Sequence, residues 1–78
     1  MRIRFREELA TTVFDRFGID VHVSDIKDGW FAISVSVRVS PGFISWLTIF
    51  GDRAEVLSPD SLRADIKALI ESLSSVYK

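Results

Sequence analysis

Apolar and polar residues alternate with two different periods along the chain, and the switches between them mark the expected elements. Residues 2–6 alternate between arginine and an apolar residue, which is typical of a strand with one buried and one exposed face. Residues 7–17 repeat their apolar positions at helical spacing, and Gly18 can end that helix. Residues 19–25 return to the two-residue period and predict a second strand.

A hairpin is expected in the middle of the chain. Asp28-Gly29 is a turn signal between two runs of alternating residues, within a loop expected from Asp25 to Gly29. The longest alternation runs from Trp30 to Val39, and its β-branched residues favour a strand. One face of this strand is expected to be apolar, with Phe31, Ile33, Val35, Val37 and Val39.

The next segment, Phe43 to Phe50, is almost entirely apolar. Periodicity does not separate a buried helix from a strand in a run this short. Ser40 can cap a helix, Pro41 suits its first position, and Gly51 can end it. We therefore expect a helix over residues 43–50 and keep a strand as the alternative.

The last third of the chain predicts a short strand and a long helix. Residues 53–57 alternate, with Ala54 and Val56 facing inward. Ser58 is expected to cap a helix over residues 59–77. Seven residues form the apolar stripe of that helix: Leu62, Ile66, Leu69, Ile70, Leu73, Val76 and Tyr77.

The expected order is strand, helix, strand, strand, helix, strand, followed by an extra helix. The first six elements fit an α+β fold of the ferredoxin-like kind, with a four-stranded antiparallel sheet. Right-handed crossovers place the first two helices on the same face of the sheet and give the strand order 4-1-3-2. Residues 1–78 are expected to form a single domain.

The sheet face away from the helices is expected to be rich in arginine. Arg2, Arg4, Trp30, Arg38 and Arg53 are the candidate binding residues on this face, and His22 would join them. Arginine beside an aromatic ring can clamp a phosphate and stack on a base. Three interpretations remain open: a solvated face, a contact surface for another domain or protomer, or a nucleic-acid or nucleotide site. In the first of these the arginines are balanced by Asp20, Asp25 and Glu55.

Composition excludes several classes of function. The 78 residues carry a net charge of −1, so nucleic-acid binding would need a local basic patch. The chain has no cysteine and one histidine, which argues against thiolate or multi-histidine metal sites and a cysteine nucleophile. We find no catalytic motif and expect neither an enzyme nor a cofactor. Without a long apolar run or a signal peptide, a soluble cytoplasmic domain without membrane contact is expected.

Residues 46–63 carry a family resemblance. Trp46-Leu47, Phe50-Gly51, Glu55-Val56-Leu57-x-Pro59 and Leu62-Arg63 stand at spacings similar to those at the C-terminal end of bacterial WYL-domain transcriptional regulators. More narrowly, the whole chain resembles their C-terminal extension, the WCX domain. Residues 1–40 match it more loosely, through an arginine-rich strand, a helix ending in Phe-Gly and an Asp-Gly-Trp turn.

The resemblance implies a role in transcription regulation. It implies that the chain is part of a longer regulator, in which a helix-turn-helix domain and a WYL domain are its partners. In that family the WYL and extension parts sense nucleic-acid or nucleotide-like ligands, and the extension takes part in dimer contacts. No helix-turn-helix pattern and no Trp-Tyr-Leu triplet occurs in this sequence. We therefore expect a homodimer that does not bind operator DNA by itself.

Two other functions stay open at this point. One is a free-standing small-molecule-binding domain similar to ACT domains, although Arg6-Glu7-Glu8 stands where those usually have a glycine-containing loop. The other is a module that binds single-stranded nucleic acid through the arginine and tryptophan face. In either case the apolar content of 47% suggests surface that self-association would cover.

Overall fold

A computed structural model describes residues 1–77. The elements in chain order are β1 (Arg2–Arg6), η1 (Glu7–Leu9), α1 (Ala10–Phe17), β2 (His22–Lys27), β3 (Trp30–Ser34), α2 (Pro41–Thr48), η2 (Gly51–Arg53), β4 (Ala54–Ser58) and α3 (Asp60–Val76). This confirms the predicted α+β class and the sequence of strands and helices. The apolar run after Ser40 is a helix, as expected.

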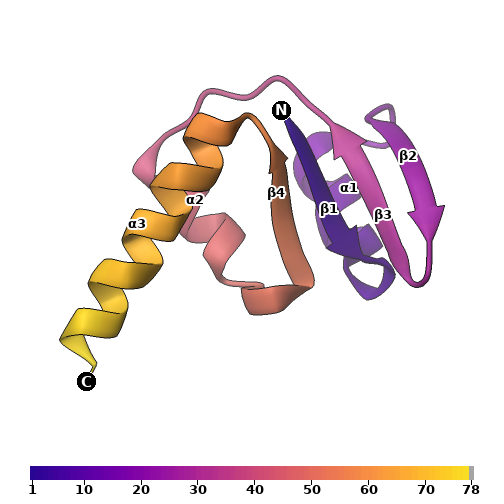
Figure 1. Cartoon of the computed structure of the whole chain (residues 1–78). Helices are drawn as coiled ribbons and strands as arrows, with labels where there is room; N and C mark the ends of the chain where they lie inside the picture. The colour runs from indigo at the N-terminus through magenta and orange to yellow at the C-terminus, as the bar shows by residue number, and fades with distance from the viewer. Residues whose placement is uncertain (78) are drawn as a thin grey trace.

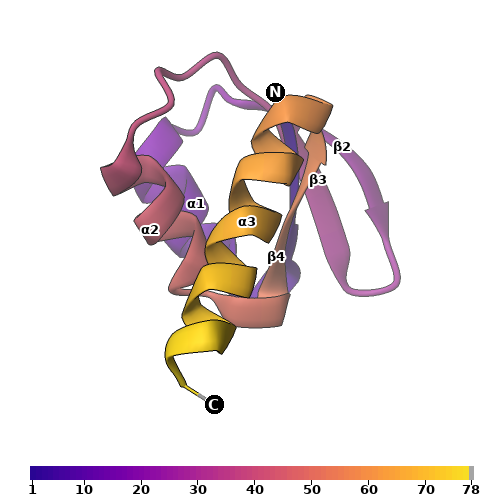
Figure 2. The same ribbon diagram turned by 60° about the vertical axis from the view of Figure 1, so that its left-hand side comes forward.

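The four strands form one antiparallel sheet in the order β2-β3-β1-β4, which reads β4-β1-β3-β2 from the other edge. β1 lies inside the sheet and pairs with β3 on one side and β4 on the other (Figure 1). α1 and α2 lie together on one side of the sheet, and α3 runs beside β4 (Figure 2). β1 therefore contacts both halves of the sheet and contributes to both of its faces.

The core lies between the sheet and the pair α1 and α2. Ile3 and Phe5 of β1 are fully buried, as are Val13 of α1 and Ile33 of β3. The Phe5 ring packs edge-on against Trp46 and Phe50, with ring centroids 6.3 and 6.2 Å away. Such edge-to-face pairs add to the free energy gained by burying the rings. The alternating apolar residues of β1 thus form the centre of the core, as predicted.

Local chemistry fixes two of the turns. Asp28 and Gly29 have φ angles of 55° and 83°, so the β2–β3 hairpin closes through two residues in the left-handed region. Asp and Gly tolerate this conformation better than other residues do, which is why the pair predicts such a turn. The Ser40 hydroxyl accepts a hydrogen bond from the Phe43 amide at 3.1 Å and caps α2.

β3 is shorter than predicted. It ends at Ser34, whereas the sequence pattern extends to Val39. The backbone of Val35 still pairs with Met1. Beyond it, none of the described strands continues, since β2 begins at His22 opposite Ser34. An alternating sequence without a neighbouring strand cannot complete its backbone hydrogen bonds as a sheet.

Other boundaries also differ from the predictions. β2 covers His22–Lys27 instead of 19–25, so Ile19 lies in the preceding turn and is 85% exposed. The predicted loop from Asp25 onward is reduced to the tight turn. Ser58 is the last residue of β4 and provides no side-chain cap for α3, in which Pro59 takes the capping position.

α3 is packed at one end only. Leu62, in its first turn, is 2% exposed and belongs to the core. Ile66 is half-buried against that core. Leu69 is half-buried, and from Ile70 onward the residues of the stripe are exposed, with Ile70 at 57% and Leu73 at 47%. The C-terminal half of α3 projects from the body of the domain (Figure 1).

This asymmetry gives a test of the fold. Leu62→Ala is expected to lower the free energy of unfolding by about 2–5 kcal/mol, because it leaves a cavity in the core. Leu73→Ala, the same chemical change on the same helix, is expected to cost less than about 0.5 kcal/mol. Urea unfolding followed by circular dichroism, at low protein concentration, measures both. Equal costs would show that the C-terminal half of α3 packs on its own domain.

Candidate functional site

The open face of the sheet is formed mainly by β1 and β3. Arg2, Arg4 and Arg6 point away from the core because they alternate with the buried Ile3 and Phe5. In the β1–β3 register, Arg4 lies opposite Ala32 and Arg6 lies opposite Trp30. We call Arg4, Arg6 and Trp30, taken together, the Trp30 cluster.

Both guanidinium groups of the Trp30 cluster lie over its ring. The Cζ atom of Arg4 is 4.1 Å from the ring centroid of Trp30, and that of Arg6 is 5.1 Å away. These are cation–π distances. Trp30 is half-buried. Beside it lies a depression of about 240 Å³, lined by Arg4, Asp25, Lys27, Asp28, Trp30, Ala32 and Leu57.

Most of the positive charge on this face is compensated. Arg2 pairs with Asp25, and the Arg4 Nε donates to a Glu55 carboxylate oxygen at 2.7 Å. Both acids are among those expected to balance the arginines, while Asp20 forms no ion pair within residues 1–77. Arg6 is different. Its one described polar contact is a long hydrogen bond of 3.5 Å to the Asp28 carbonyl, so its charge remains available to a ligand.

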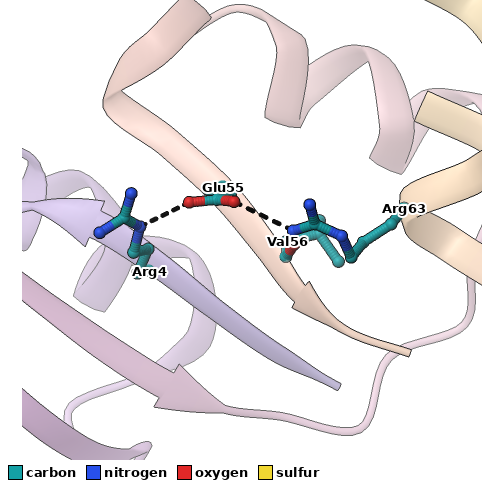
Figure 3. A network of polar contacts seen from close by, with 4 residues as sticks. All are labelled: Arg4, Glu55, Val56 and Arg63. Atoms are coloured by element: carbon teal, nitrogen blue, oxygen red, sulfur yellow. Dashed lines mark hydrogen bonds and ion pairs between the residues drawn. The ribbon is translucent and has the colours of Figure 1, made fainter. Parts of the chain in front are cut away.

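Glu55 connects the open face to α3 (Figure 3). One of its carboxylate oxygens accepts from Arg4 and the other accepts from Arg63 Nη1 at 3.0 Å. Arg63 also donates to the backbone carbonyl of Val56. A single side chain of β4 therefore holds the central strand on one side and the first turn of α3 on the other.

These contacts shift the acidity of Glu55. The hydrogen bond from Arg63, followed by that from Arg4, holds the pKa of the Glu55 carboxyl below its ordinary value of 4.5, although partial burial works in the opposite direction. The carboxyl is thus ionised at neutral pH and forms a three-membered ion network. At 38% exposure of the Glu55 side chain, water weakens both pairs.

The structure brings together three of the five predicted binding residues. Arg2, Arg4 and Trp30 share the open face, and His22 lies in the same row as Arg2, with Ser34 of β3 between them. Two placements were wrong. Arg38 is exposed in the irregular segment after β3, because that strand ends four residues earlier. Arg53 lies in η2 before β4 starts, and its Nε donates to the Phe50 carbonyl at 3.4 Å.

Two residues of the candidate site were not predicted from the sequence. Arg6 continues the alternation of β1, so the two-residue period was sufficient to place it beside Trp30. Arg63 stands in the sequence stretch that carries the family resemblance, but its pairing with Glu55 bridges a strand and a helix. No periodicity within one element reveals a contact of that kind.

A larger groove lies between α3, β4 and the end of α2. Its volume is about 640 Å³. Its lining is mostly apolar, with Arg63, Lys67 and Glu55 as the charged members; the other residues are Leu47, Thr48, Gly51, Ala54, Val56, Ala64, Ile66 and Ile70.

Among residues 1–77 no helix combines the length and the apolar character that a membrane span requires.

The family model of the WCX domain matches residues 1–74. The chain belongs to the WCX domain family. Comparison with curated proteins and comparison with solved structures both gave no match. The match covers β1 through nearly all of α3, so the resemblance seen in residues 46–63 extends over the complete sheet and its helices.

The residues that carry the resemblance in the sequence have structural explanations. Glu55 and Arg63 form an ion pair, while Val56 and Leu62 are 5% and 2% exposed in the core. Trp46 contacts Phe17, Phe43 and Phe50 through its ring. These residues hold α2, β4 and α3 together, which makes the most recognisable part of the sequence architectural.

The acidity of Glu55 predicts a pH-dependent contribution to stability. Because its pKa is lowered by folding, the contribution is complete above the unfolded value of 4.5 and is lost as pH falls below it. Glu55→Gln is expected to cost about 0.5–1 kcal/mol at pH 7, a range typical of exposed ion pairs. The difference from the unmodified chain should shrink on acidification.

Thermal or urea unfolding between neutral and acidic pH measures this difference. Asp65→Asn is the matched control, since Asp65 is an exposed carboxylate of α3 with no ion pair among the described residues. Its profile should parallel that of the unmodified chain. A Glu55→Gln profile that also runs parallel at every pH would contradict the role given to this carboxylate.

Proposed function

We propose that this WCX domain is the non-catalytic, effector-sensing and oligomerisation domain of a WYL-family transcriptional regulator. The observation that carries the proposal is the family match, which covers 74 of the 78 residues. In this proposal the domain passes the state of its ligand or of its assembly to a DNA-binding domain that this sequence does not contain. Its partners are the WYL and helix-turn-helix domains of the same regulator and a second copy of itself.

We propose that the domain has a ferredoxin-like fold. Two observations support it: the strand order reads 4-1-3-2 from one edge, and α1 and α2 lie on the same side of the sheet (Figure 2). Such a frame leaves one sheet face without helices, which makes that face available for a ligand or for a neighbouring domain. The Trp30 cluster lies on that free face.

The chemistry of the Trp30 cluster favours an effector that combines phosphate with an aromatic base. Arg6 supplies a guanidinium whose charge no described carboxylate neutralises. Trp30 supplies a flat ring at the edge of a depression of about 240 Å³, on which a base can stack when it displaces one of the two arginines that lie over the ring. A single-stranded nucleic acid or a nucleotide has a phosphate for the first group and a base for the second. Because Asp25 and Glu55 neutralise Arg2 and Arg4, the electrostatic attraction of this face for phosphate is limited. We therefore expect a modest affinity.

Binding of oligonucleotides tests the effector class. We expect a fluorescently labelled single-stranded oligonucleotide to bind more tightly than a duplex of the same length, because bases must be accessible for stacking. Arg6→Ala is expected to weaken single-strand binding and to flatten its salt dependence by about one phosphate contact. Fluorescence anisotropy at several salt concentrations measures both effects.

Arg38→Ala is the matched control, because it removes the same charge from a residue away from the Trp30 cluster. It is expected to leave single-strand binding almost unchanged. Equal weakening by both variants would mean that net charge, and not the Trp30 cluster, determines binding. If the unmodified domain bound neither oligonucleotides nor free nucleotides, this effector class would be excluded.

A further inference from the structure

The C-terminal half of α3 presents an apolar ridge to solvent. Ile70, Leu73, Val76 and Tyr77 are 57%, 47%, 70% and 82% exposed. The first three follow each other at helical spacing and lie along one side of α3, and Tyr77 comes directly after its last residue. An exposed row of this kind on a small domain marks a contact surface.

The N-terminal half of the same helix borders the apolar groove. Arg63, Ile66, Lys67 and Ile70 form its α3 wall, and residues 54–56 of β4 line it as well. The wall extends over about two helical turns, or about 11 Å, and the ridge from Ile70 to Tyr77 has the same length. In Figure 1 α3 diverges from β4 toward its C-terminal end, so groove and ridge follow each other along one helix.

We propose that a second copy of this chain docks here, with the two α3 helices antiparallel and related by a twofold axis near Ile70. A twofold axis brings the C-terminal ridge of each copy to the N-terminal groove of the other. Leu73 of one copy then lies opposite Ile66 of the other, and Val76 lies opposite Arg63. The apolar ridge that one chain leaves exposed is covered by the groove of the next.

The distribution of charge on α3 supports a second copy as the occupant. Between Ile66 and Tyr77 the helix carries two charged residues, Lys67 and Glu71. They stand two residues on either side of Leu69, close to the proposed axis. In an antiparallel pair, Lys67 of each copy therefore lies beside Glu71 of the other, so that the contact forms two equivalent ion pairs at its edge.

Glu55 connects the proposed interface to the Trp30 cluster. Glu55 lines the groove and accepts a hydrogen bond from Arg4, which covers the Trp30 ring. A ligand that pulls Arg4 away would free an oxygen of Glu55 at the edge of the groove. The inference thus deepens the oligomerisation part of the proposed function, because it names the surface and connects it to the effector site.

Sedimentation equilibrium of the complete chain over a wide concentration range provides the first test. We expect a reversible dimer, which Leu73→Glu weakens at least about tenfold by placing a charge in the apolar contact. Ile26→Glu is the matched control: Ile26 is 76% exposed on β2, away from α3, and its replacement should leave the dimer unchanged. Circular dichroism of both variants verifies that they remain folded.

Charge exchange tests the antiparallel register. Lys67→Glu and Glu71→Lys should each weaken self-association, because each brings like charges together across the axis. An equimolar mixture of these two variants should form heterodimers, since opposite charges then face each other at both positions. This mixture separates pairing between chains from the weak pairing of residues 67 and 71 within one helix.

Crosslinking fixes the position of the axis. The chain has no cysteine, so Ile70→Cys introduces a single thiol beside its symmetry mate, and oxidation should give a disulfide-linked dimer. Ile26→Cys should give no disulfide-linked dimer under the same conditions. A dimer that resists Leu73→Glu and does not crosslink at residue 70 would overturn this interface while leaving the proposed oligomerisation function intact. A chain that stays monomeric at every concentration would overturn both.

Discussion

The alternation of residues in β1 is the constraint on which the rest of the domain depends. β1 pairs on both sides, so each of its side chains faces either the helices or the open side of the sheet. Ile3 and Phe5 are completely buried and form the centre of the core. Arg4 and Arg6 lie on the opposite face, where they form the Trp30 cluster together with Trp30. A shift of this strand by one residue would bury arginines and expose the core, so the register of one strand determines both stability and the candidate site.

Glu55 connects the open face of the sheet to α3. Its carboxylate binds Arg4 on the central strand and Arg63 in the first turn of α3. The stretch that resembles WCX domains therefore includes a contact that holds the first turn of α3. The direction of α3 in turn determines where its apolar ridge lies. In the proposed function the same contact connects an effector on the open face with the association of two chains.

The sequence predicted well those features that depend on neighbouring residues. The faces of β1, the Asp28-Gly29 turn and the Ser40 cap follow from local periodicity and side-chain chemistry. It failed where a distant segment decides the outcome. β3 ends because no partner strand continues beside it, which moved Arg38 away from the site. The period of α3 identified its apolar stripe, but only the fold shows that Leu62 belongs to the core and that Leu73 does not.

In this proposal the N-terminal end of α3 packs in the core of its own chain, and its C-terminal end packs against a second chain. Amide hydrogen exchange at low and at high protein concentration tests it most directly. We expect residues 70–77 to exchange fast in the dilute protein and to become protected as concentration rises, while β1 stays protected throughout. Protection of residues 70–77 that equals that of β1 at every concentration would contradict it, and so would rapid exchange at every concentration.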